Sequence, residues 1–579
     1  MIRDYKLDFF RYFIKDRRAF IGYFILSIIV GGLELFGVAL TYPFIYRLIT
    51  NEKMDLYSLV FGILIIVAFI AKNVFMIFYN LLQANFTQNT EAYMNKKFME
   101  FFIHGNYNLT SNISLSKKYK ITGFLIPFSI GNYLLRILNL IVNVFIFSLL
   151  VGFLFVKYFV ATCITLACSI VLLIIETLYL RHKTKILAKK ISKSQEELNQ
   201  ATNIPLLNLK SIKIIKGEDY FFEKYCRKFD KQKEISKKLS FYNSVPPYIT
   251  EPFIIIILLI LLTIISFQYQ SEASVLVASY AVVVSVAFRL APTISRIQVN
   301  ITGLYNSFPQ VKELVEYYKE FELETFLPEV KEFDNFNSSI VLQDVSFAYK
   351  DKNVLNNINL KINKGEFIGI AGSSGIGKTT LVDVIAGLLA KKSGNIYIDD
   401  KLLDDDTLPK LKIGYIPQEY NTISASIREN VAFGVKDIDD EKVVEVLKLA
   451  QLYDYIEENF IDGIYAKPFV DSIGFSQGQK QRLAIARALY LDPDIIILDE
   501  ATSSLDLKTE NEICEILHKL KGEKTIIAIA HRISTIKNAD KIFLMQNSTI
   551  AAQGNFNELY NTNSEFKKLV ELNNANSIH

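Results

Sequence analysis

The first half of the chain alternates long apolar runs with basic, polar segments. Six runs are apolar over about 20 or more residues, the length that a helix needs to cross a hydrocarbon core about 30 Å thick. They lie near residues 20–46, 57–84, 132–157, 159–181, 248–269 and 272–297. We therefore expect residues 1–326 to form an all-α, six-helix transmembrane domain.

The connections between these runs differ in length and charge. Those after the first, third and fifth runs are short, whereas those after the second and fourth are long and rich in lysine, as in Arg181–Lys193 and Lys210–Lys238. Basic segments stay on the cytoplasmic side of a membrane. We therefore expect a multi-pass protein of the inner (cytoplasmic) membrane with both termini in the cytoplasm. The long connections keep helical periodicity, so they are expected to extend beyond the lipid bilayer and turn back around Asn108–Ser114 and Ile204–Ser211.

Beyond Phe326 the pattern becomes that of a soluble α/β domain. Residues 327–339 (LPEVKEFDNFNSS) are polar, contain a proline, and are expected to form a linker. Short apolar runs then predict strands at Ser339–Tyr349, Glu366–Ala371, Asp494–Leu498 and Lys524–Ile529, and the last two are continuous enough to be buried on both faces. Residues 340–573 are expected to form one α/β domain.

Charge and cysteine content exclude two classes of function. The net charge of +4 over 579 residues is small and spread out, so nucleic acid is not expected as the main partner. None of the four cysteines lies in a C-x-x-C pair or beside clustered histidines, so neither a zinc site nor a disulfide scaffold is expected. They are Cys163, Cys168, Cys226 and Cys514.

A glycine-rich segment follows the predicted strand that ends at Ala371. Gly372–Thr379 (GSSGIGKT) fits the phosphate-binding loop pattern and precedes a predicted helix, Thr380–Leu389. Its glycines allow backbone N–H groups to approach phosphates closely, and the helix adds its positive N-terminal end. Lys378 would pair with the β- and γ-phosphates of ATP, and the Thr379 hydroxyl would coordinate Mg²⁺. The other candidate nucleotide contacts here are Ser373, Ser374, Gly375, Ile376, Gly377 and Thr380.

Two carboxylates follow a second apolar strand. Asp499 and Glu500 come after Ile495–Leu498, at the carboxyl end of the strand, where open α/β sheets bind ligands. Asp499 suits the Mg²⁺ shell, and Glu500 suits the polarisation of a water molecule that attacks the γ-phosphate.

Together these motifs resemble the ABC transporter ATPase family, and the resemblance covers Ile340–Leu572. The segment Phe475–Gln479 (FSQGQ) is similar to the signature motif of that family. The resemblance implies that Ser476, Gln477, Gly478 and Gln479 contact the γ-phosphate held by an opposite subunit. Here Gln477 replaces the usual glycine and Phe475 the usual leucine, and Val470–Gly474 lacks the acidic, glycine-rich stretch of many exporters.

Further positions match the same family. The resemblance implies that Tyr349 stacks on adenine, that Gln418 links Mg²⁺ to the membrane domain, and that His531 contacts the γ-phosphate. It also implies that Asp506, in the segment Ser504–Asp506, belongs to a loop that crosses the dimer interface. Because one chain holds a single loop and a single signature, we expect a homodimer. Six spans fused to a cassette, together with the segment Ser426–Gly434, resemble exporter-type half-transporters.

Basic residues within the predicted spans suggest the class of cargo. Lys72, Arg136, Arg289 and Arg296 would form a basic ring in a homodimer, which suits an anionic lipid drawn from the cytoplasmic leaflet. An alternative is that these side chains reach the membrane surface or pair with Glu34 and Glu251.

Two stretches sharpen the resemblance. Gly32–Ile45 and Ala287–Ile297, with Leu209–Glu218, are similar to PglK-type flippases of lipid-linked oligosaccharides. This implies flipping of a polyprenyl-pyrophosphate oligosaccharide, although the loop after the first span is shorter than in that group. A lipid A or phospholipid flippase, a peptide or drug exporter, and a non-transporting regulatory ATPase are the alternatives.

Overall fold

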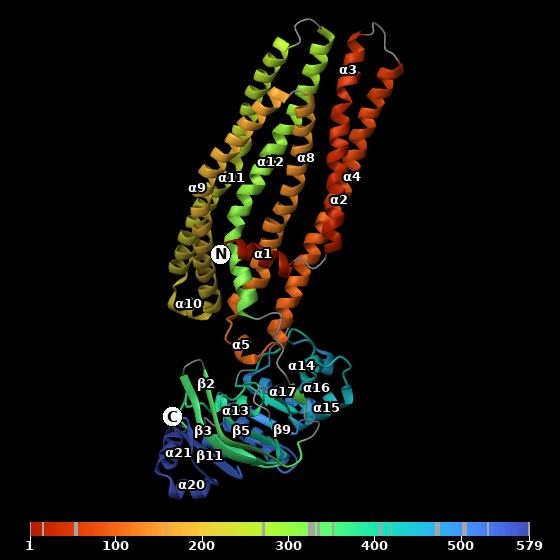
Figure 1. The fold of residues 1–579 in the computed structure, drawn as a ribbon. Coiled ribbons are helices and arrows are strands. Elements are labelled where there is room, and N and C mark those ends of the chain that lie inside the picture. Colours follow the sequence, from red (N-terminus) through yellow and green to blue (C-terminus); the bar gives the residue numbers. More distant parts are fainter. Residues whose placement is uncertain are drawn as a thin grey trace. The chain divides into compact units, whose positions relative to one another are not determined.

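The described chain forms two compact units. The computed structural model describes residues 2–13, 17–50, 56–157, 159–268, 273–321, 330–332, 336–349, 352–403, 408–418, 420–468, 475–500, 507–529 and 532–576. The first unit, here called the helical unit, comprises Met1–His104 and Ile113–Phe326. The second, the cassette unit, comprises Gly105–Asn112 and Leu327–His579 (Figure 1). Helix α5 (Tyr107–Ser111) therefore belongs to the cassette unit although it lies within the first third of the sequence.

The helical unit is built from long helices joined by short turns. In chain order these are α1 (Ile2–Phe13), α2 (Arg17–Ala39), α3 (Thr41–Thr50), α4 (Leu56–His104), α6 (Leu115–Lys120), α7 (Ile126–Phe128), α8 (Leu135–Lys157), α9 (Phe159–Leu207), α10 (Leu209–Ile215), α11 (Glu218–Gln268) and α12 (Ala273–Glu320). Two π-helical turns, Ile121–Leu125 and Ser129–Leu134, flank α7. Helix α9 packs on α11, α2 on α4, and α8 on α12 (Figure 1).

Four of these helices continue well beyond a membrane span. Helices α4, α9, α11 and α12 contain 49, 49, 51 and 48 residues, which is about 70 Å of helix each at about 1.5 Å per residue. Each of these helices is therefore longer than a membrane span alone requires. By length and composition, four described stretches could cross a membrane: Phe20–Ile49, Leu56–His104, Leu115–Val156 and Leu276–Glu320. The predicted spans near 159–181 and 248–269 lie within the continuous helices α9 and α11.

The first predicted span is divided into two helices. Helix α2 ends at Ala39 and α3 begins at Thr41, with Pro43 in the first turn of α3. Proline has no backbone N–H and is tolerated in the first turn of a helix, where that group lacks a helical partner. The continuous apolar run near 20–46 gave no indication of this break.

The cassette unit is organised around a six-stranded sheet with the order β12-β11-β4-β10-β9-β8. Its strands are β4 (Phe367–Ala371), β8 (Ile413–Ile416), β9 (Ile495–Asp499), β10 (Thr525–Ile529), β11 (Lys541–Gln546) and β12 (Thr549–Gly554). All neighbouring pairs are parallel except β11 and β12. Strands β4 and β10 are buried along their whole length, as parallel strands covered on both faces must be.

A second, antiparallel sheet has the order β3-β2-β5-β6. It consists of β2 (Ser339–Tyr349), β3 (Lys352–Asn363), β5 (Ser393–Ile398) and β6 (Lys401–Leu402). The helices of this unit are α13 (Lys378–Ile385), α14 (Ile427–Val431), α15 (Asp440–Leu449), α16 (Tyr453–Asn459), α17 (Gln477–Tyr490), α18 (Leu507–Leu520), α19 (Ile533–Ile536), α20 (Phe556–Thr562) and α21 (Ser564–Asn576).

The expected linker is partly ordered into the cassette unit. Strand β1 (Val330–Glu332) pairs in parallel with β7 (Leu408–Lys410). Phe336 is 1% exposed and belongs to the core between the two sheets. Backbone pairing and one buried ring therefore hold parts of the segment that was expected to form a linker.

Candidate nucleotide site

The loop Gly372–Thr379 joins strand β4 to helix α13, as its spacing predicted. Gly372 has φ +150° and Gly377 has φ +109°, values that favour glycine, and a Cβ on Gly372 would lie 2.7 Å from the Met545 carbonyl oxygen. The Lys378 ammonium donates hydrogen bonds to the carbonyl oxygens of Gly372 (2.8 Å) and Ser373 (3.1 Å). The lysine thus folds back over its own loop. Burial lowers the pKa of Lys378, an effect that Glu500 and Asp499 partly oppose.

Strand β9 delivers both predicted carboxylates to one edge of the sheet. Asp499 is its last residue, and Glu500 follows with φ +51°, in the left-handed region. The Glu500 N–H donates to the Ile529 carbonyl oxygen at 3.3 Å, which ties this turn to β10. Since both carboxylates act on the pKa of Lys378, the lysine-bearing loop and the acidic strand end form one electrostatic site.

Three residues join this site without having been expected there. The Tyr415 hydroxyl, on β8, donates a hydrogen bond of 2.9 Å to Asp499 Oδ2. Burial, with the charge of Asp499, raises the pKa of Asp383 from its ordinary 3.8 to about 6. Burial also raises the pKa of Tyr107 on α5, and Asp383, Tyr349 and Asp499 add to that shift.

The sequence did contain a signal for one of these residues. Asp383 lies four residues after Thr379 on α13, so both side chains project from the same helical face. Tyr415 and Tyr107 lie 84 and 392 residues before Asp499, and no local pattern indicates such long-range proximity.

The signature segment begins helix α17. Ser476 is its N-cap: the Ser476 hydroxyl oxygen accepts from the Gln479 N–H, and Gln479 Oε1 accepts from the Ser476 N–H at 2.7 Å. This reciprocal capping box fixes the start of the helix and points its positive end outward. A cavity of about 290 Å³ adjoins it, lined by Ser476, Gly478 and Gln479 together with residues from the α15–α16 region.

The two departures from the family signature fit the local packing. Phe475 is 5% exposed, and its ring centroid lies 5.7 Å from that of Phe460 and 6.1 Å from that of Tyr455. An aromatic cluster therefore occupies the place of the usual leucine contact. Gln477 is exposed at the first position of α17, where its side chain meets no steric barrier.

The remaining predicted nucleotide residues are only partly described. Tyr349 ends β2 with a partly exposed ring, 4.9 Å from that of Phe347. Gln418 follows β8 and is exposed. Asp506 and His531 lie outside the described residues, as does the Val470–Gly474 departure. Within the described chain, no hydrogen bond or ion pair joins Gly372–Thr379 to Ser476–Gln479.

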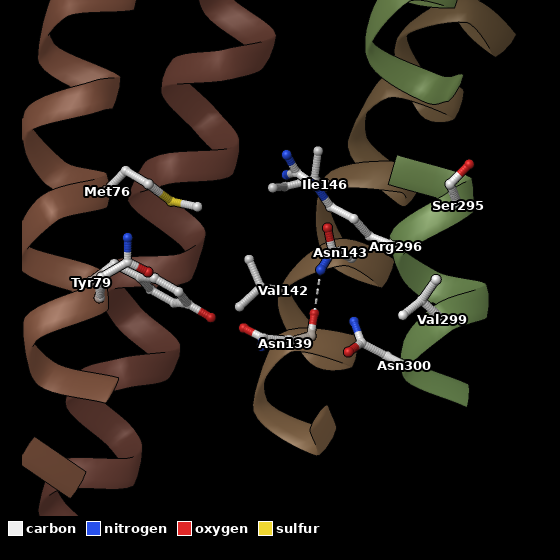
Figure 2. Close-up of a pocket in the computed structure, with 11 residues that line it drawn as sticks. Met76, Tyr79, Asn139, Val142, Asn143, Ile146, Ser295, Arg296, Val299 and Asn300 are labelled. Atoms are coloured by element: carbon white, nitrogen blue, oxygen red, sulfur yellow. Dashed lines mark hydrogen bonds between the residues drawn. The ribbon is translucent and has the colours of Figure 1, made fainter. Parts of the chain in front are cut away.

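The predicted cargo residues have different environments in the helical unit. Arg289 Nη1 lies 2.8 Å and Lys72 Nζ 3.5 Å from Glu34 Oε1, so two of the four cations share one carboxylate. Arg136 Nη1 donates to the Val299 carbonyl oxygen at 3.1 Å. Arg296 lines a cavity between α4, α8 and α12 (Figure 2).

Comparison with known proteins agrees with this geometry. Residues 355–503 match the family model for ABC transporter. The C-terminal domain is thus similar in sequence to ABC transporter ATPase cassettes and has their fold. The cassette match includes the loop, Gln418, the signature and both strand-end carboxylates.

Two relatives illustrate the similarity. The putative multidrug export ATP-binding/permease protein YgaD of Bacillus subtilis is 36% identical over 292 residues, which are 50% of each chain. The leukotoxin export ATP-binding protein LtxB of Aggregatibacter actinomycetemcomitans is 40% identical over 237 residues, 40% of this chain and 32% of that one. The aligned region spans half the length of these relatives or less.

The whole fold matches a solved exporter. A bacterial Atm1-family ABC exporter with ATP bound superposes with a TM-score of 0.79 over 96% of this chain and 98% of that chain, at 18% sequence identity. The chain therefore has the exporter fold, in which a helical domain is fused to the cassette. The names of these relatives refer to multidrug export, leukotoxin export and the Atm1 family, so the resemblance to PglK-type flippases stays a prediction.

Proposed function

We propose that the protein is an ATP-driven exporter that works as a homodimer and moves an anionic, lipid-linked cargo out of the cytoplasmic leaflet. The observation that supports this most is the fusion of a cassette to a helical unit whose cavity carries a basic residue. A polyprenyl-pyrophosphate oligosaccharide is our candidate cargo, on the sequence resemblance described above. The inner membrane, with the cassette in the cytoplasm, is the proposed location, on the lysine-rich connections.

The chemistry of the site suits Mg²⁺ with ATP. The Thr379 hydroxyl, the Gln418 carboxamide and the Asp499 carboxylate are oxygen donors, which Mg²⁺ prefers. Among the described residues no group of three His, Cys, Asp or Glu side chains could hold a metal by itself. This fits an ion held by few protein ligands together with phosphate oxygens. When bound, the ion would neutralise phosphate charge, while Lys378 would release Gly372 and Ser373 to pair with the phosphates.

Two further features support the homodimer. The loop and the signature occur once per chain, and ATP bridging them across two subunits would favour a closed pair until hydrolysis removes the γ-phosphate.

The turn between α9 and α11 also presents apolar side chains to solvent. These are Leu206, Leu207, Leu209, Ile214 and Ile215, between 55% and 83% exposed. We propose that this tip docks on the cassette of the second subunit, since clustered exposed apolar residues mark interaction surfaces.

A multidrug or peptide exporter is the second candidate. It is favoured by the relatives whose names refer to multidrug and leukotoxin export. The two candidates differ in the cargo that the helical unit must accept, not in the cassette chemistry.

Reconstitution in proteoliposomes separates these candidates. We would incorporate a polyprenyl pyrophosphate that carries a biotinylated disaccharide and measure its capture by external streptavidin. ATP added outside reaches only cassettes that face outward, so export by those chains should move the lipid inward and reduce capture. Glu500→Gln protein is the control. ATP-driven uptake of rhodamine 6G without any change in lipid capture would assign the protein to the second candidate instead.

A further inference from the structure

The helical unit contains a polar cavity, and among its lining residues the predicted basic ring included only Arg296. It has a volume of about 380 Å³ and lies between α4, α8 and α12. Seven of its eleven lining side chains are polar, among them the carboxamides of Asn80, Asn139, Asn143 and Asn300. Polar groups among membrane-spanning helices are costly unless they meet partners or polar ligands. The composition of this cavity therefore does not fit an apolar cargo.

One side chain points to a missing ligand. Tyr79 is 2% exposed, and its hydroxyl has no hydrogen-bond partner among the described residues. Figure 2 shows this hydroxyl directed from α4 toward Asn139 and Val142 on α8, into the cavity. A buried hydroxyl that lacks a partner destabilises the fold. A ligand that accepts or donates one hydrogen bond at this position would remove that cost.

The carboxamides are arranged to offer both donors and acceptors. Gln83 Nε2 donates to Asn139 Oδ1 at 3.0 Å, which leaves the Asn139 amide N–H groups for a ligand. Asn143 Nδ2 donates to the Asn139 carbonyl oxygen at 2.6 Å, which leaves Asn143 Oδ1 to accept. Hydroxyl groups both donate and accept hydrogen bonds, so a polyol matches this mixture.

Charge and depth restrict the ligand further. Arg296 reaches from α12 into the cavity (Figure 2) and makes no ion pair or hydrogen bond within the described chain, so it can bind an anion. Tyr79 lies near the C-terminal end of the predicted span 57–84, and Arg296 lies near the C-terminal end of the span 272–297. Asn139 lies near the N-terminal end of the span 132–157. These three ends are the ones expected to face the cytoplasm. In the topology expected from the lysine-rich connections, this is the level of lipid headgroups in the inner leaflet.

We propose that this cavity binds the hydroxyl-bearing phosphate headgroup of a lipid, with Arg296 on the phosphate and Tyr79 and the carboxamides on the hydroxyls. The inference rests on the proposed export of an anionic lipid and names the chemistry of its headgroup. The alkyl chains would remain in the bilayer beside the helices.

The test measures equilibrium binding of labelled short-chain lipids to the full-length protein without nucleotide. Phosphatidylcholine nanodiscs replace glycoside detergents, whose sugars would compete for the cavity. Dihexanoyl phosphatidylinositol supplies phosphate and hydroxyls, and dihexanoyl phosphatidic acid supplies phosphate alone. We expect the inositol lipid to bind about tenfold more tightly, since two or more extra hydrogen bonds are made. Equal binding of the two lipids would overturn the proposal.

Tyr79→Phe and Tyr23→Phe form a matched pair. The Tyr23 hydroxyl is also buried without a partner in the described chain, and its ring lies 4.5 Å from that of Tyr79, but Tyr23 does not line the cavity. Both variants should melt at or above the wild-type temperature because each loses an unsatisfied hydroxyl. Only Tyr79→Phe should weaken inositol-lipid binding, by about 3- to 10-fold. A lower melting temperature for Tyr79→Phe, or equal binding by both variants, would show a structural role and overturn the proposal.

Three further measurements complete the test. Arg296→Gln should weaken the binding of both anionic lipids by about tenfold or more, since a charge-assisted contact to the phosphate is lost. Free inositol phosphate that binds as tightly as the lipid would overturn the assignment to a lipid. Equal or tighter binding of rhodamine 6G would overturn the headgroup assignment altogether. Because no nucleotide is present, a failure of ATP-driven transport with binding intact would count against the exporter proposal and not against this site.

Discussion

At the scale of single residues, the end of strand β9 carries a strained backbone. Glu500 has φ +51°, a conformation that costs a non-glycine residue on the order of 1 kcal/mol, and its N–H is held by the Ile529 carbonyl oxygen. Such strain persists where the surroundings fix it, and it commonly marks functional positions. We propose that Asp499 serves the metal at this position and that Glu500 serves the attacking water.

Glu500→Gln tests this division of roles. We expect ATP turnover to fall by about 10²- to 10⁴-fold, because a general base is removed, while ATP binding persists through Lys378 and the loop. Turnover by a phosphate-release assay and binding by a fluorescent nucleotide give the two readouts. Glu515→Gln on the exposed face of α18 is the control. Substantial turnover in the Glu500 variant would remove its assigned role.

Asp383 gives a pH-dependent prediction. Its native pKa of about 6 exceeds the ordinary 3.8, so between these values the native state binds more protons than the unfolded state. The free energy of unfolding therefore falls as pH rises from about 3.8 to about 6. Above pH 6 the destabilisation by the ionised Asp383 is complete and no longer changes with pH. In nucleotide-free protein, Asp383→Asn should be more stable than wild type at pH 7.5 by on the order of 1–3 kcal/mol.

The stability difference should shrink as the pH approaches 4. Calorimetric melting of the cassette transition between pH 4.5 and 7.5 measures it, with the exposed Asp437→Asn as control. A difference between the Asp383 variant and wild type that does not change with pH would contradict the raised pKa.

At the scale of elements, helices α8 and α12 approach each other closely through one glycine. A Cβ on Gly303 would lie 2.2 Å from the Arg136 guanidinium carbon, and that guanidinium also donates to the Val299 carbonyl oxygen. Because Gly303 on α12 has no side chain, the Arg136 guanidinium from α8 can occupy the space beside it. Small residues serve this purpose at helix interfaces in membranes.

Gly303→Ala should therefore destabilise the helical unit. The Cβ would meet the end of a flexible side chain, so the main cost is the loss of the Arg136 hydrogen bond to Val299, about 1 kcal/mol. Gly152→Ala in α8 is the matched control, because nothing lies within 4 Å of the Cβ it would gain. Alanine favours helices over glycine, so this control should be neutral or slightly stabilising. Thermal melting in nanodiscs distinguishes the two, and equal melting temperatures would contradict the close approach.

The sequence predicted the elements that depend on local patterns. Ser339–Tyr349 is a strand with the predicted bounds, and β4, β9 and β10 begin or end within one residue of their predicted limits. The apolar period and the adjacent glycines determine these features locally. The loop and the strand-end carboxylates were predictable for the same reason.

Features that depend on contacts distant in sequence were not predicted. Neither the hydrogen bond from Tyr415 to Asp499 nor the burial that raises the pKa of Asp383 has a local signature. The pairing of Lys72 and Arg289 with Glu34 was only one of the alternatives, because charge pairing depends on which helices become neighbours. The π-helical turns beside α7 likewise follow no pattern in the sequence.

At the scale of the whole molecule, the proposed nucleotide site shared by two chains would make the dimer the unit of function. If each ATP lies between the phosphate-binding loop of one chain and the signature of a second chain, then a single chain should still bind ATP but should not hydrolyse it. Nanodiscs loaded with one or two chains test this. Nanodiscs with one chain should bind ATP through Lys378 but hydrolyse it only at background level. Nanodiscs with two chains should both bind and hydrolyse ATP.

Glu500→Gln chains in two-chain discs control for the surroundings, since they retain the pairing but lose hydrolysis. Equal turnover per chain in one-chain and two-chain wild-type discs would exclude the shared site. It would also remove the basis for coupling through paired cassettes.

Helix α5 has a consequence for how the protein responds to cleavage. Because Gly105–Asn112 belongs to the cassette unit, the chain passes between the two units at three points: after His104, after Asn112 and after Phe326. A protease that nicks the chain near Leu327 leaves two of these passages uncut. The fragments should therefore migrate as one particle under native conditions and part only when denaturant releases α5 from the cassette.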